Sequence, residues 1–248
     1  PMNRAILIVG ATSGIGTALA KHLAKRGCDL VLAGRNPGEL ERRAADLQLR
    51  YGVCAEIQRF EARDSARHED FVRNCLHAAK GDLEGVALCH GDMPEPGSQG
   101  PAAHEIDNAV AVNYTSSTIL LEILAPYFEQ RKSGWICAIT SVAGDRGRPS
   151  NYFYGSTKAA LSTYLQGLRA RLGRSGTRVV DVRPGFVDTQ LTWGLPGLFL
   201  VASPEAVAHD IDRGIQRNRA VVYTPGFWRF IMLIIRNIPD RIFGRLEL

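Results

Sequence analysis

The stretch of residues 5–16 constrains the fold more than any other part of the sequence. Residues 5–10 form a short apolar run that fits a strand buried on both faces. A loop with the spacing Gly-x-x-x-Gly-x-Gly follows, and apolar residues then recur with a helical period as far as Ala24. This order predicts a nucleotide-phosphate site, because glycine lets the backbone approach a ligand and a helix N-terminus attracts anions. A plain strand-to-helix turn is the less favoured alternative. The residues expected at the nucleotide are Gly10, Thr12, Ser13, Gly14, Ile15 and Gly16.

The pattern that follows alternates between strand and helix. The expected elements are a strand at 29–34, a helix at 37–51, a strand at 53–60, a helix at 65–79 and a strand at 85–91, with a last strand at 220–224. A chain of 248 residues, 45% of them hydrophobic, can bury one large core. We therefore predict a single α/β domain over residues 1–248, with a doubly wound, mainly parallel sheet and helices on both faces. The loop at 92–101 would lie at the carboxyl end of the fourth strand, where ligands bind in such sheets.

Arg35 follows the second expected strand directly. In nucleotide-binding folds an acidic residue at this strand end holds the ribose 2′-hydroxyl, whereas a nearby arginine suits a 2′-phosphate. Arg35 therefore favours NADP over NAD as the cofactor, and NAD remains the alternative. An arginine that is merely solvated at the surface is the other interpretation.

Tyr154 and Lys158 lie four residues apart at the start of a helix that we expect to begin within residues 150–158. That spacing puts both side chains on one helix face. An ammonium group beside a phenol lowers the tyrosine pKa towards working pH, and the pair could then transfer a proton at a carbonyl or an alcohol. Alone the pair is weak evidence, since many solvated helices carry Tyr and Lys one turn apart.

Ser141 ends an expected buried strand at 135–140, and Asn113 lies inside an expected long helix at 107–131. A serine hydroxyl at a strand end can polarise a substrate carbonyl. No histidine base and no G-x-S-x-G motif accompanies Ser141, so nucleophilic hydrolysis is disfavoured. The alternatives are that Ser141 caps a helix and that Asn113 bends one.

In order and spacing, these motifs resemble those of the short-chain dehydrogenases/reductases over residues 5–189. The resemblance implies hydride transfer to or from the 4-pro-S position of nicotinamide C4, with Tyr154 as the acid/base. It also implies that Lys158 lowers the tyrosine pKa and bonds the ribose, that Ser141 polarises the substrate, and that Asn113 supports a water-mediated proton relay.

The same resemblance extends to the stretch 184–189, which is similar to the family's Pro-Gly loop. Thr189 would contact the nicotinamide carboxamide. The resemblance also implies cofactor contacts by Tyr154, Lys158, Pro184, Gly185 and Val187. One departure is the sequence Leu-Cys-His-Gly at 88–91, where the family commonly has Asn-Asn-Ala-Gly. His90 could touch cofactor or substrate, although a structural histidine is the favoured interpretation.

The C-terminal third carries the features that bear on the substrate. Residues 190–217 begin with an apolar stretch that suits a substrate lid, with an ordinary buried loop as the alternative. Residues 226–248 combine aromatic and aliphatic side chains with arginines, which fits packing on the core or a second subunit, or a membrane-surface anchor. This segment and the Tyr154 neighbourhood resemble those of bacterial decaprenylphosphoryl-2-keto-ribose reductases. That likeness implies a lipid-linked keto sugar or another amphipathic ketone as substrate.

Composition excludes several other classes. The net charge of +5 comes from scattered basic residues, so nucleic-acid binding is disfavoured. The six histidines lack metal-ligand spacing, and no metal is expected. Five cysteines without a C-x-x-C pair indicate reduced thiols, and residues 1–10 lack the pattern of a signal peptide. We therefore expect a cytoplasmic protein, with peripheral contact at the inner membrane face if residues 226–248 bind lipid. Family resemblance implies a homodimer or homotetramer.

These observations together predict an NADP-dependent oxidoreductase that acts on a ketone or a secondary alcohol. One alternative is a reductase of soluble ketones or acyl-carrier thioesters, in which residues 226–248 serve only packing. The alternative of another class is a non-catalytic protein that binds NADP as a sensor.

Overall fold

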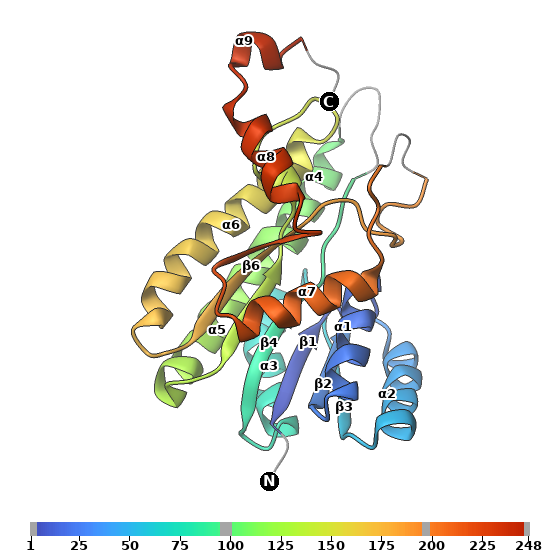
Figure 1. The fold of residues 1–248 in the computed structure, drawn as a ribbon. Helices are drawn as coiled ribbons and strands as arrows, with labels where there is room; N and C mark the ends of the chain where they lie inside the picture. Colours follow the sequence, from blue (N-terminus) through green and yellow to red (C-terminus); the bar gives the residue numbers. More distant parts are fainter. Residues whose placement is uncertain (1–3, 95–100, 195–198, 246–248) are drawn as a thin grey trace.

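The computed structural model describes residues 4–94, 101–194 and 199–245 (Figure 1). Over these residues seven parallel strands form one sheet in the order β3-β2-β1-β4-β5-β6-β7. The strands are β1 (Ala5–Val9), β2 (Asp29–Gly34), β3 (Ala55–Arg59), β4 (Leu83–Leu88), β5 (Trp135–Ile139), β6 (Arg178–Pro184) and β7 (Val221–Thr224). Much of the expected loop at 92–101, and Leu195 and Leu198 of the expected lid, lie outside the described residues.

The order of the strands reverses between β1 and β4. From β1 the chain proceeds through β2 to β3 at one edge, and β4 then returns to pair with the other side of β1. A reversal of this kind opens a crevice at the carboxyl ends of the two strands. The predicted α/β class and doubly wound parallel sheet are confirmed.

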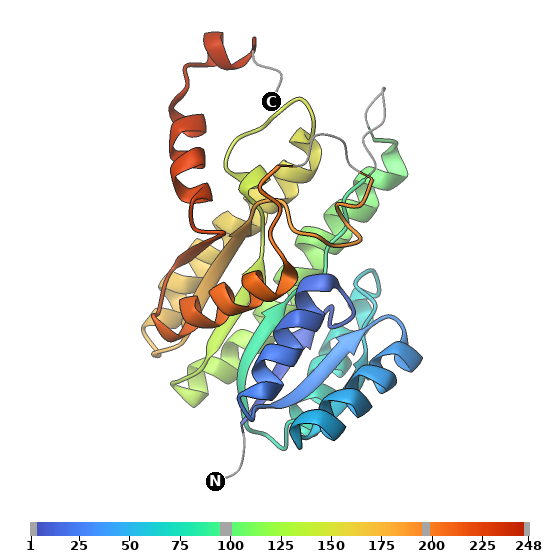
Figure 2. The same cartoon turned by 45° about the vertical axis from the view of Figure 1, so that its right-hand side comes forward.

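Helices cover both faces of this sheet (Figure 2). They are α1 (Gly14–Lys25), α2 (Pro37–Tyr51), α3 (His68–Ala78), α4 (Ala103–Val110), α5 (Ser116–Arg131), α6 (Tyr152–Gly173), α7 (Pro204–Gln216), α8 (Trp228–Asn237) and α9 (Asp240–Phe243). Helices α1, α2 and α7 share one apolar core with the sheet, and α3, α5 and α6 share the core on the opposite face. Strands β1, β4 and β5 are almost entirely apolar and buried, as strands covered on both faces require, whereas the edge strand β3 carries polar side chains.

The expected helix at 107–131 is interrupted. It begins earlier, with α4, and a π-helical turn at Ala111–Thr115 separates α4 from α5. Asn113 lies in that turn. Asn113 therefore lies at an irregular point of the helix, and π-turns often occur at functional sites.

Helix α7 occupies most of the second half of the predicted lid range 190–217. Its apolar side chains pack in the core next to α1, with Val207, Ala208 and Ile211 fully buried. A helix anchored in this way is part of the scaffold, so only the stretch before α7 remains a candidate lid.

The C-terminal segment forms α8 and α9, which extend beyond the end of the sheet in Figure 1. Trp228 and Met232 on one side of α8 are buried, whereas Phe230, Leu233 and Ile234 are exposed. The segment therefore packs on the core with one face only. No helix among the described residues combines the length and apolar character that crossing a membrane requires.

Candidate active site

The glycine loop joins β1 to α1 at the switch point of the sheet. Gly10 has a φ of +83°, which favours glycine, and a Cβ there would lie 2.5 Å from the backbone nitrogen of His90. A Cβ on Gly16 would overlap the carbonyl oxygen of Gly10. These two glycines therefore allow the backbones of the loop, of α1 and of the chain after β4 to approach one another closely.

Ser13 begins helix α1. Its hydroxyl accepts a hydrogen bond from the amide of Gly16 at 3.0 Å and donates one to the carbonyl of Cys89 at 3.2 Å. The other first amides of α1 have no acceptor within the helix, and no acidic side chain lies in the first turn. The donor set therefore fits an anionic group such as a pyrophosphate.

Thr189 reaches the glycine loop from the other side of the crevice. A Cβ on Gly14 would lie 2.6 Å from Cγ2 of Thr189. The stretch 184–189 thus meets the loop, as the expected shared cofactor site requires. Pro184 ends β6, and Val187 is buried and bridges to Ala202.

Arg35 follows β2 and is exposed beside the start of α2. A second arginine nearby, Arg43 of α2, was not singled out from the sequence. Its guanidinium pairs with Glu39 at 2.6 Å and donates to the backbone oxygen of Thr12 at 3.5 Å. Since Glu39 compensates the charge of Arg43, Arg35 remains the stronger candidate for a 2′-phosphate.

Tyr154, Lys158 and Ser141 come together where β5 meets α6. Lys158 Nζ lies 5.7 Å from the centre of the Tyr154 ring and donates a hydrogen bond to the carbonyl of Ile139 at 3.1 Å. Ser141 hydrogen-bonds to Tyr154, and its hydroxyl caps a short 3₁₀ turn by accepting from the amide of Ala143 at 3.0 Å. The expected common face of Tyr154 and Lys158 is therefore present.

The pKa of Tyr154 departs from the expectation drawn from the sequence. Burial raises the pKa of Tyr154 to about 12, and a hydrogen bond from Ser141 only partly opposes that rise. Burial also lowers the pKa of Lys158 to about 8, while Asp181 and Cys89 oppose that fall. The expected lowering of the tyrosine pKa by Lys158 is therefore wrong, because desolvation raises this pKa and the effect that opposes the rise comes from Ser141.

Asn113 is buried and tied to its surroundings by three hydrogen bonds. Its Oδ1 accepts from the amide of Asp92 at 2.7 Å, and its Nδ2 donates to the carbonyl of Asp92 at 2.7 Å and to Thr157 Oγ1 at 3.1 Å. A Cβ on Gly91 would lie 3.2 Å from Lys158 Nζ and 3.3 Å from Asn113 Oδ1. Asn113 thus joins the group formed by Ser141, Tyr154 and Lys158.

Comparison with known proteins decides the family. The sequence profile described as short chain dehydrogenase matches residues 4–196, well over half of the chain. The chain belongs to the short-chain dehydrogenase family. Among its relatives, an uncharacterised oxidoreductase of Mycobacterium tuberculosis is 33% identical over 244 residues, which cover 97% of this chain and 96% of the relative. The predicted family, and with it the prediction of an oxidoreductase, is confirmed.

Solved structures agree with this assignment. A short-chain dehydrogenase from Sphingobium yanoikuyae in complex with NADPH is 28% identical, with a TM-score of 0.81 over 96% of this chain and 97% of that one. A bulky-bulky ketone specific alcohol dehydrogenase from Comamonas testosteroni is 26% identical, with a TM-score of 0.79 over 96% of this chain and 95% of that one.

His90 of this short-chain dehydrogenase, at the departure from the family pattern, has a structural contact. Its Nε2 lies 2.9 Å from the hydroxyl of Ser116, which in turn donates to the carbonyl of Val112 in the π-turn. Burial lowers the pKa of His90 to about 3, so the ring is neutral at ordinary pH. These contacts agree with the favoured interpretation of a structural histidine that links β4 to the turn bearing Asn113.

Sequence reasoning missed a set of buried charged residues beside Ser141 in this dehydrogenase. Asp181 and Arg183 are both buried in β6 and form an ion pair at 2.7 Å. The available signal was two opposite charges two positions apart in an otherwise apolar stretch, since such residues share one face of a strand. In the described part of the chain, no group of three or more His, Cys, Asp and Glu side chains could hold a metal ion.

Proposed function

We propose that this short-chain dehydrogenase reduces a ketone to a secondary alcohol with NADPH. The observation that carries the proposal is the convergence of Ser141, Tyr154 and Lys158 at the same crevice as the glycine loop. The Sphingobium yanoikuyae relative was solved with NADPH, and Arg35 offers a cation for a 2′-phosphate.

The residues of the crevice fit the cofactor. The loop amides would hold the pyrophosphate, Arg35 the 2′-phosphate, Lys158 the ribose and Thr189 the carboxamide. The glycines at 10, 14 and 16 let the loop pack closely on α1 and on the stretches after β4 and β6, because a side chain there would collide with neighbouring protein atoms. When bound, the reduced nicotinamide would supply the hydride that the carbonyl carbon accepts.

Tyr154 supplies the proton in this proposal. Its raised pKa of about 12 keeps the phenol protonated at neutral pH, so the hydroxyl can donate to the developing alkoxide. Ser141 donates a hydrogen bond to the same oxygen and polarises the carbonyl. Lys158 stabilises the phenolate that remains, and Asn113 keeps the chain after β4 in place for proton return from solvent.

An amphipathic ketone is the substrate that the surroundings favour, with a lipid-linked keto sugar as one example. Large apolar side chains lie exposed in the stretch before α7, where a substrate would enter. They are Leu191, Trp193, Phe199, Leu200 and Val201. The Comamonas testosteroni relative is described as specific for bulky-bulky ketones, which agrees with a wide apolar entrance.

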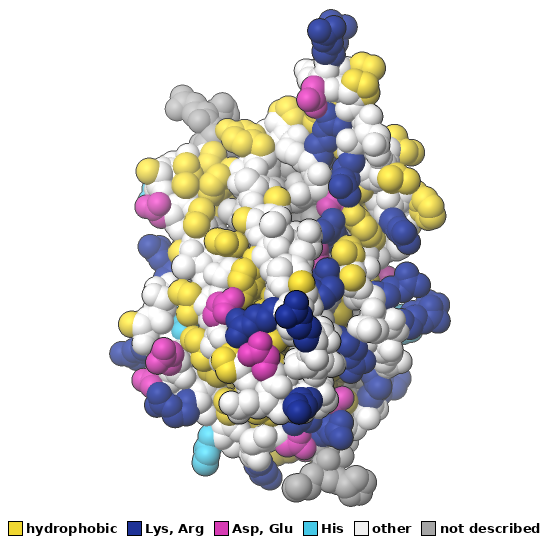
Figure 3. Space-filling model, turned by 90° about the vertical axis from the view of Figure 1, so that its left-hand side faces the viewer, with side chains coloured by type: hydrophobic (Ala, Val, Ile, Leu, Met, Phe, Trp, Pro, Cys, Tyr) yellow, Lys and Arg dark blue, Asp and Glu magenta, His cyan; other side chains and the backbone are white. Residues whose placement is uncertain are grey.

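The exposed face of α8 favours peripheral contact with a membrane at the cytoplasmic side. Phe230, Leu233 and Ile234 share one helix face and are 68%, 61% and 67% exposed. Arg229 and Arg236 flank them, and Figure 3 shows basic and hydrophobic side chains together at the end of the molecule that bears α8. Such a face suits the boundary of anionic headgroups and acyl chains.

We also propose that the protein forms a homodimer or a homotetramer. Size-exclusion chromatography coupled to light scattering would measure its mass in solution.

Oxidation of NADPH in the presence of a panel of ketones tests the reaction. Wild-type protein should turn over at least one bulky ketone, and Tyr154→Phe should lose turnover while it still binds NADPH in a fluorescence titration. Turnover of only small soluble ketones or acyl-carrier thioesters would refute the amphipathic substrate. Cofactor binding without turnover by the wild type would instead favour a sensor.

Co-sedimentation with vesicles of phosphatidylglycerol tests the membrane contact. Wild-type protein should bind, and a variant with Phe230→Ser, Leu233→Ser and Ile234→Ser should not. Because these side chains are exposed, the variant should keep its activity on a soluble ketone. Absence of binding by the wild type would refute the contact.

A further inference from the structure

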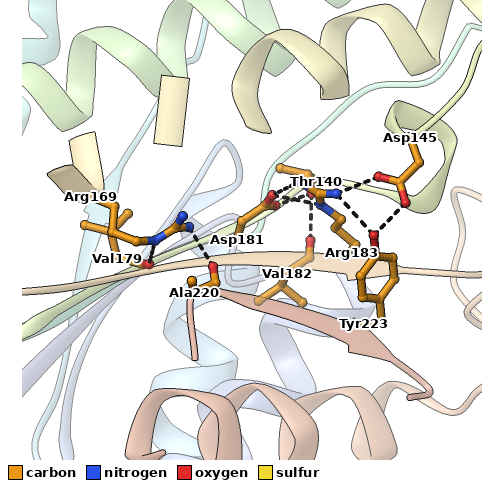
Figure 4. Close-up of polar contacts among 9 residues, drawn as sticks. All are labelled: Thr140, Asp145, Arg169, Val179, Asp181, Val182, Arg183, Ala220 and Tyr223. Carbon is orange, nitrogen blue, oxygen red and sulfur yellow. Dashed lines mark hydrogen bonds and ion pairs between the residues drawn. The ribbon is translucent and has the colours of Figure 1, made fainter. Parts of the chain in front are cut away.

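Five residues next to Ser141 form a largely buried polar network, and Figure 4 draws their side chains. We call it the β6 network. It consists of Thr140, Asp145, Asp181, Arg183 and Tyr223. Asp181 and Arg183 project from β6 to the side of the sheet that α6 covers, as Val179 on the same strand does.

Each charge in the β6 network has a partner. Arg183 Nε donates to Asp181 Oδ2 at 2.8 Å, and Arg183 Nη1 donates to Asp145 Oδ1 at 2.7 Å. The hydroxyl of Tyr223 donates to Asp145 Oδ2 at 2.7 Å, and the hydroxyl of Thr140 donates to Asp181 Oδ1 at 2.5 Å. The side chains of Asp181 and Asp145 are 0% and 2% exposed, so solvent screens these contacts little.

The β6 network holds both ends of the segment that carries Ser141. Thr140 precedes the serine directly, and Asp145 closes the 3₁₀ turn that the serine caps. We call residues 141–145 the Ser141 turn. Thr140, just before the turn, is held to β6 by its side chain and by a backbone bond to Val182 at 2.7 Å, and Asp145 at the end of the turn is held to β6 and β7.

Helix α6 packs against the opposite side of the Ser141 turn. A Cβ on Gly144 would lie 2.8 Å from the backbone nitrogen of Ala159, and a Cβ on Gly155 would lie 2.5 Å from the carbonyl oxygen of Ala143. The turn is therefore confined between the β6 network and the first two turns of α6, which carry Tyr154 and Lys158.

We propose that Asp145 and Arg183 are positioning residues that hold the Ser141 hydroxyl against the hydroxyl of Tyr154. This inference rests on the proposed function, since it names what aligns two of its groups. The stability of the fold does not explain why these charges are buried, because well-packed apolar side chains of similar volume often stabilise a core equally well. Directional bonds at both ends of the turn fix an orientation that apolar packing leaves looser.

Asp145→Asn tests the inference, because it keeps the shape and removes the charge. We expect kcat to fall about tenfold or more, as for a misplaced reacting group, while the dissociation constant of NADPH stays within about twofold. The glycine loop would hold the pyrophosphate of the cofactor, and the hydrogen bonds of the β6 network do not involve that loop. Tyr223→Phe, which removes one donor to Asp145 and keeps the ring, should lower kcat less, and it serves as the test should Asp145→Asn fail to fold.

Asp212→Asn is the matched control. Asp212 is also buried, and it pairs with Arg26 and His22, but it belongs to α7 on the other face of the sheet. This variant should lose thermal stability to a similar extent and keep its kcat. Equal losses of kcat in the two variants would overturn the inference, and so would an unchanged kcat in Asp145→Asn.

A double-mutant cycle separates this inference from the proposed function. In a Ser141→Ala background, Asp145→Asn should cost less than about twofold in kcat, because the group that it positions is gone. Full additivity of the two effects would show that Asp145 acts elsewhere. If the wild type turned over none of the ketones, that result would instead refute the proposed function itself.

Discussion

Gly155→Ala measures how closely the Ser141 turn and α6 must approach. The new Cβ would lie 2.5 Å from the carbonyl oxygen of Ala143. Carbon and oxygen atoms in proteins rarely approach closer than about 3.3 Å, so the turn and the helix must separate by roughly 0.8 Å. The displaced groups are Ala143, whose amide donates to the Ser141 hydroxyl, and Gly155, which follows Tyr154 directly. A misplacement of about 1 Å can cost about 100-fold in rate, so we expect kcat to fall 10-fold to 100-fold.

Gly167→Ala is the control, because Gly167 lies in the same helix and a Cβ there meets nothing within 4 Å. It should keep kcat and gain up to about 1 kcal/mol of stability from helix propensity. Steady-state oxidation of NADPH gives kcat, and urea unfolding gives the free energy. A wild-type kcat in Gly155→Ala would refute the idea that this contact sets the distance between the serine and the tyrosine.

Two further predictions concern charge. Arg35→Asp should shift the ratio of kcat/KM for NADPH and NADH towards NADH by about tenfold or more, whereas Arg50→Asp at the far end of α2 should leave it unchanged. An unaltered ratio in Arg35→Asp would refute the cofactor assignment. The pKa of Lys158 is about 8 in the folded protein and about 10.4 in an unfolded chain, so the unfolded state binds more protons between these values. The free energy of unfolding of the wild type should therefore rise with pH in that window. Lys158→Met lacks this ionisation, so the difference in unfolding free energy in favour of the variant should shrink by about 3 kcal/mol from pH 7 to pH 11. A difference in urea-unfolding free energy that does not change with pH would contradict this.

The sheet was predictable because most of its strands are short apolar runs that alternate with helical patterns. One strand, β6, was not assigned from the sequence. Asp181 and Arg183 interrupt its apolar run, and their burial depends on Thr140, Asp145 and Tyr223 from other parts of the chain. Local patterning carries no information about such partners.

The π-turn within the long helix was out of reach for a related reason. Periodicity indicates a helix but does not reveal one extra residue in a turn. The hydrogen bonds of Asn113 to Asp92 and Thr157 stabilise this irregular geometry, and they form only once β4 and α6 are in place.

Motif spacing predicted which candidate catalytic side chains would lie together, but not their pKa values. Four residues of helix put Lys158 beside Tyr154, and the end of β5 put Ser141 near both. The direction of each pKa shift is set instead by desolvation, which for Lys158 outweighs the opposing charge of Asp181. Burial is a property of the whole fold, so the sequence alone suggested the wrong sign for the tyrosine.

The two faces of α8 have different surroundings: one packs on the core near the Ser141 turn, and the other is exposed. On the inner face, the Trp228 indole lies so close to Gly185 that a Cβ there would overlap it. Arg146, next to Asp145, donates to the carbonyls of Ile235 and Ile238 at 2.7 and 2.6 Å. Deletion of residues 226–248 would therefore disturb the Ser141 turn as well as any lipid contact. Substitutions confined to the exposed face are the ones that can separate membrane binding from catalysis.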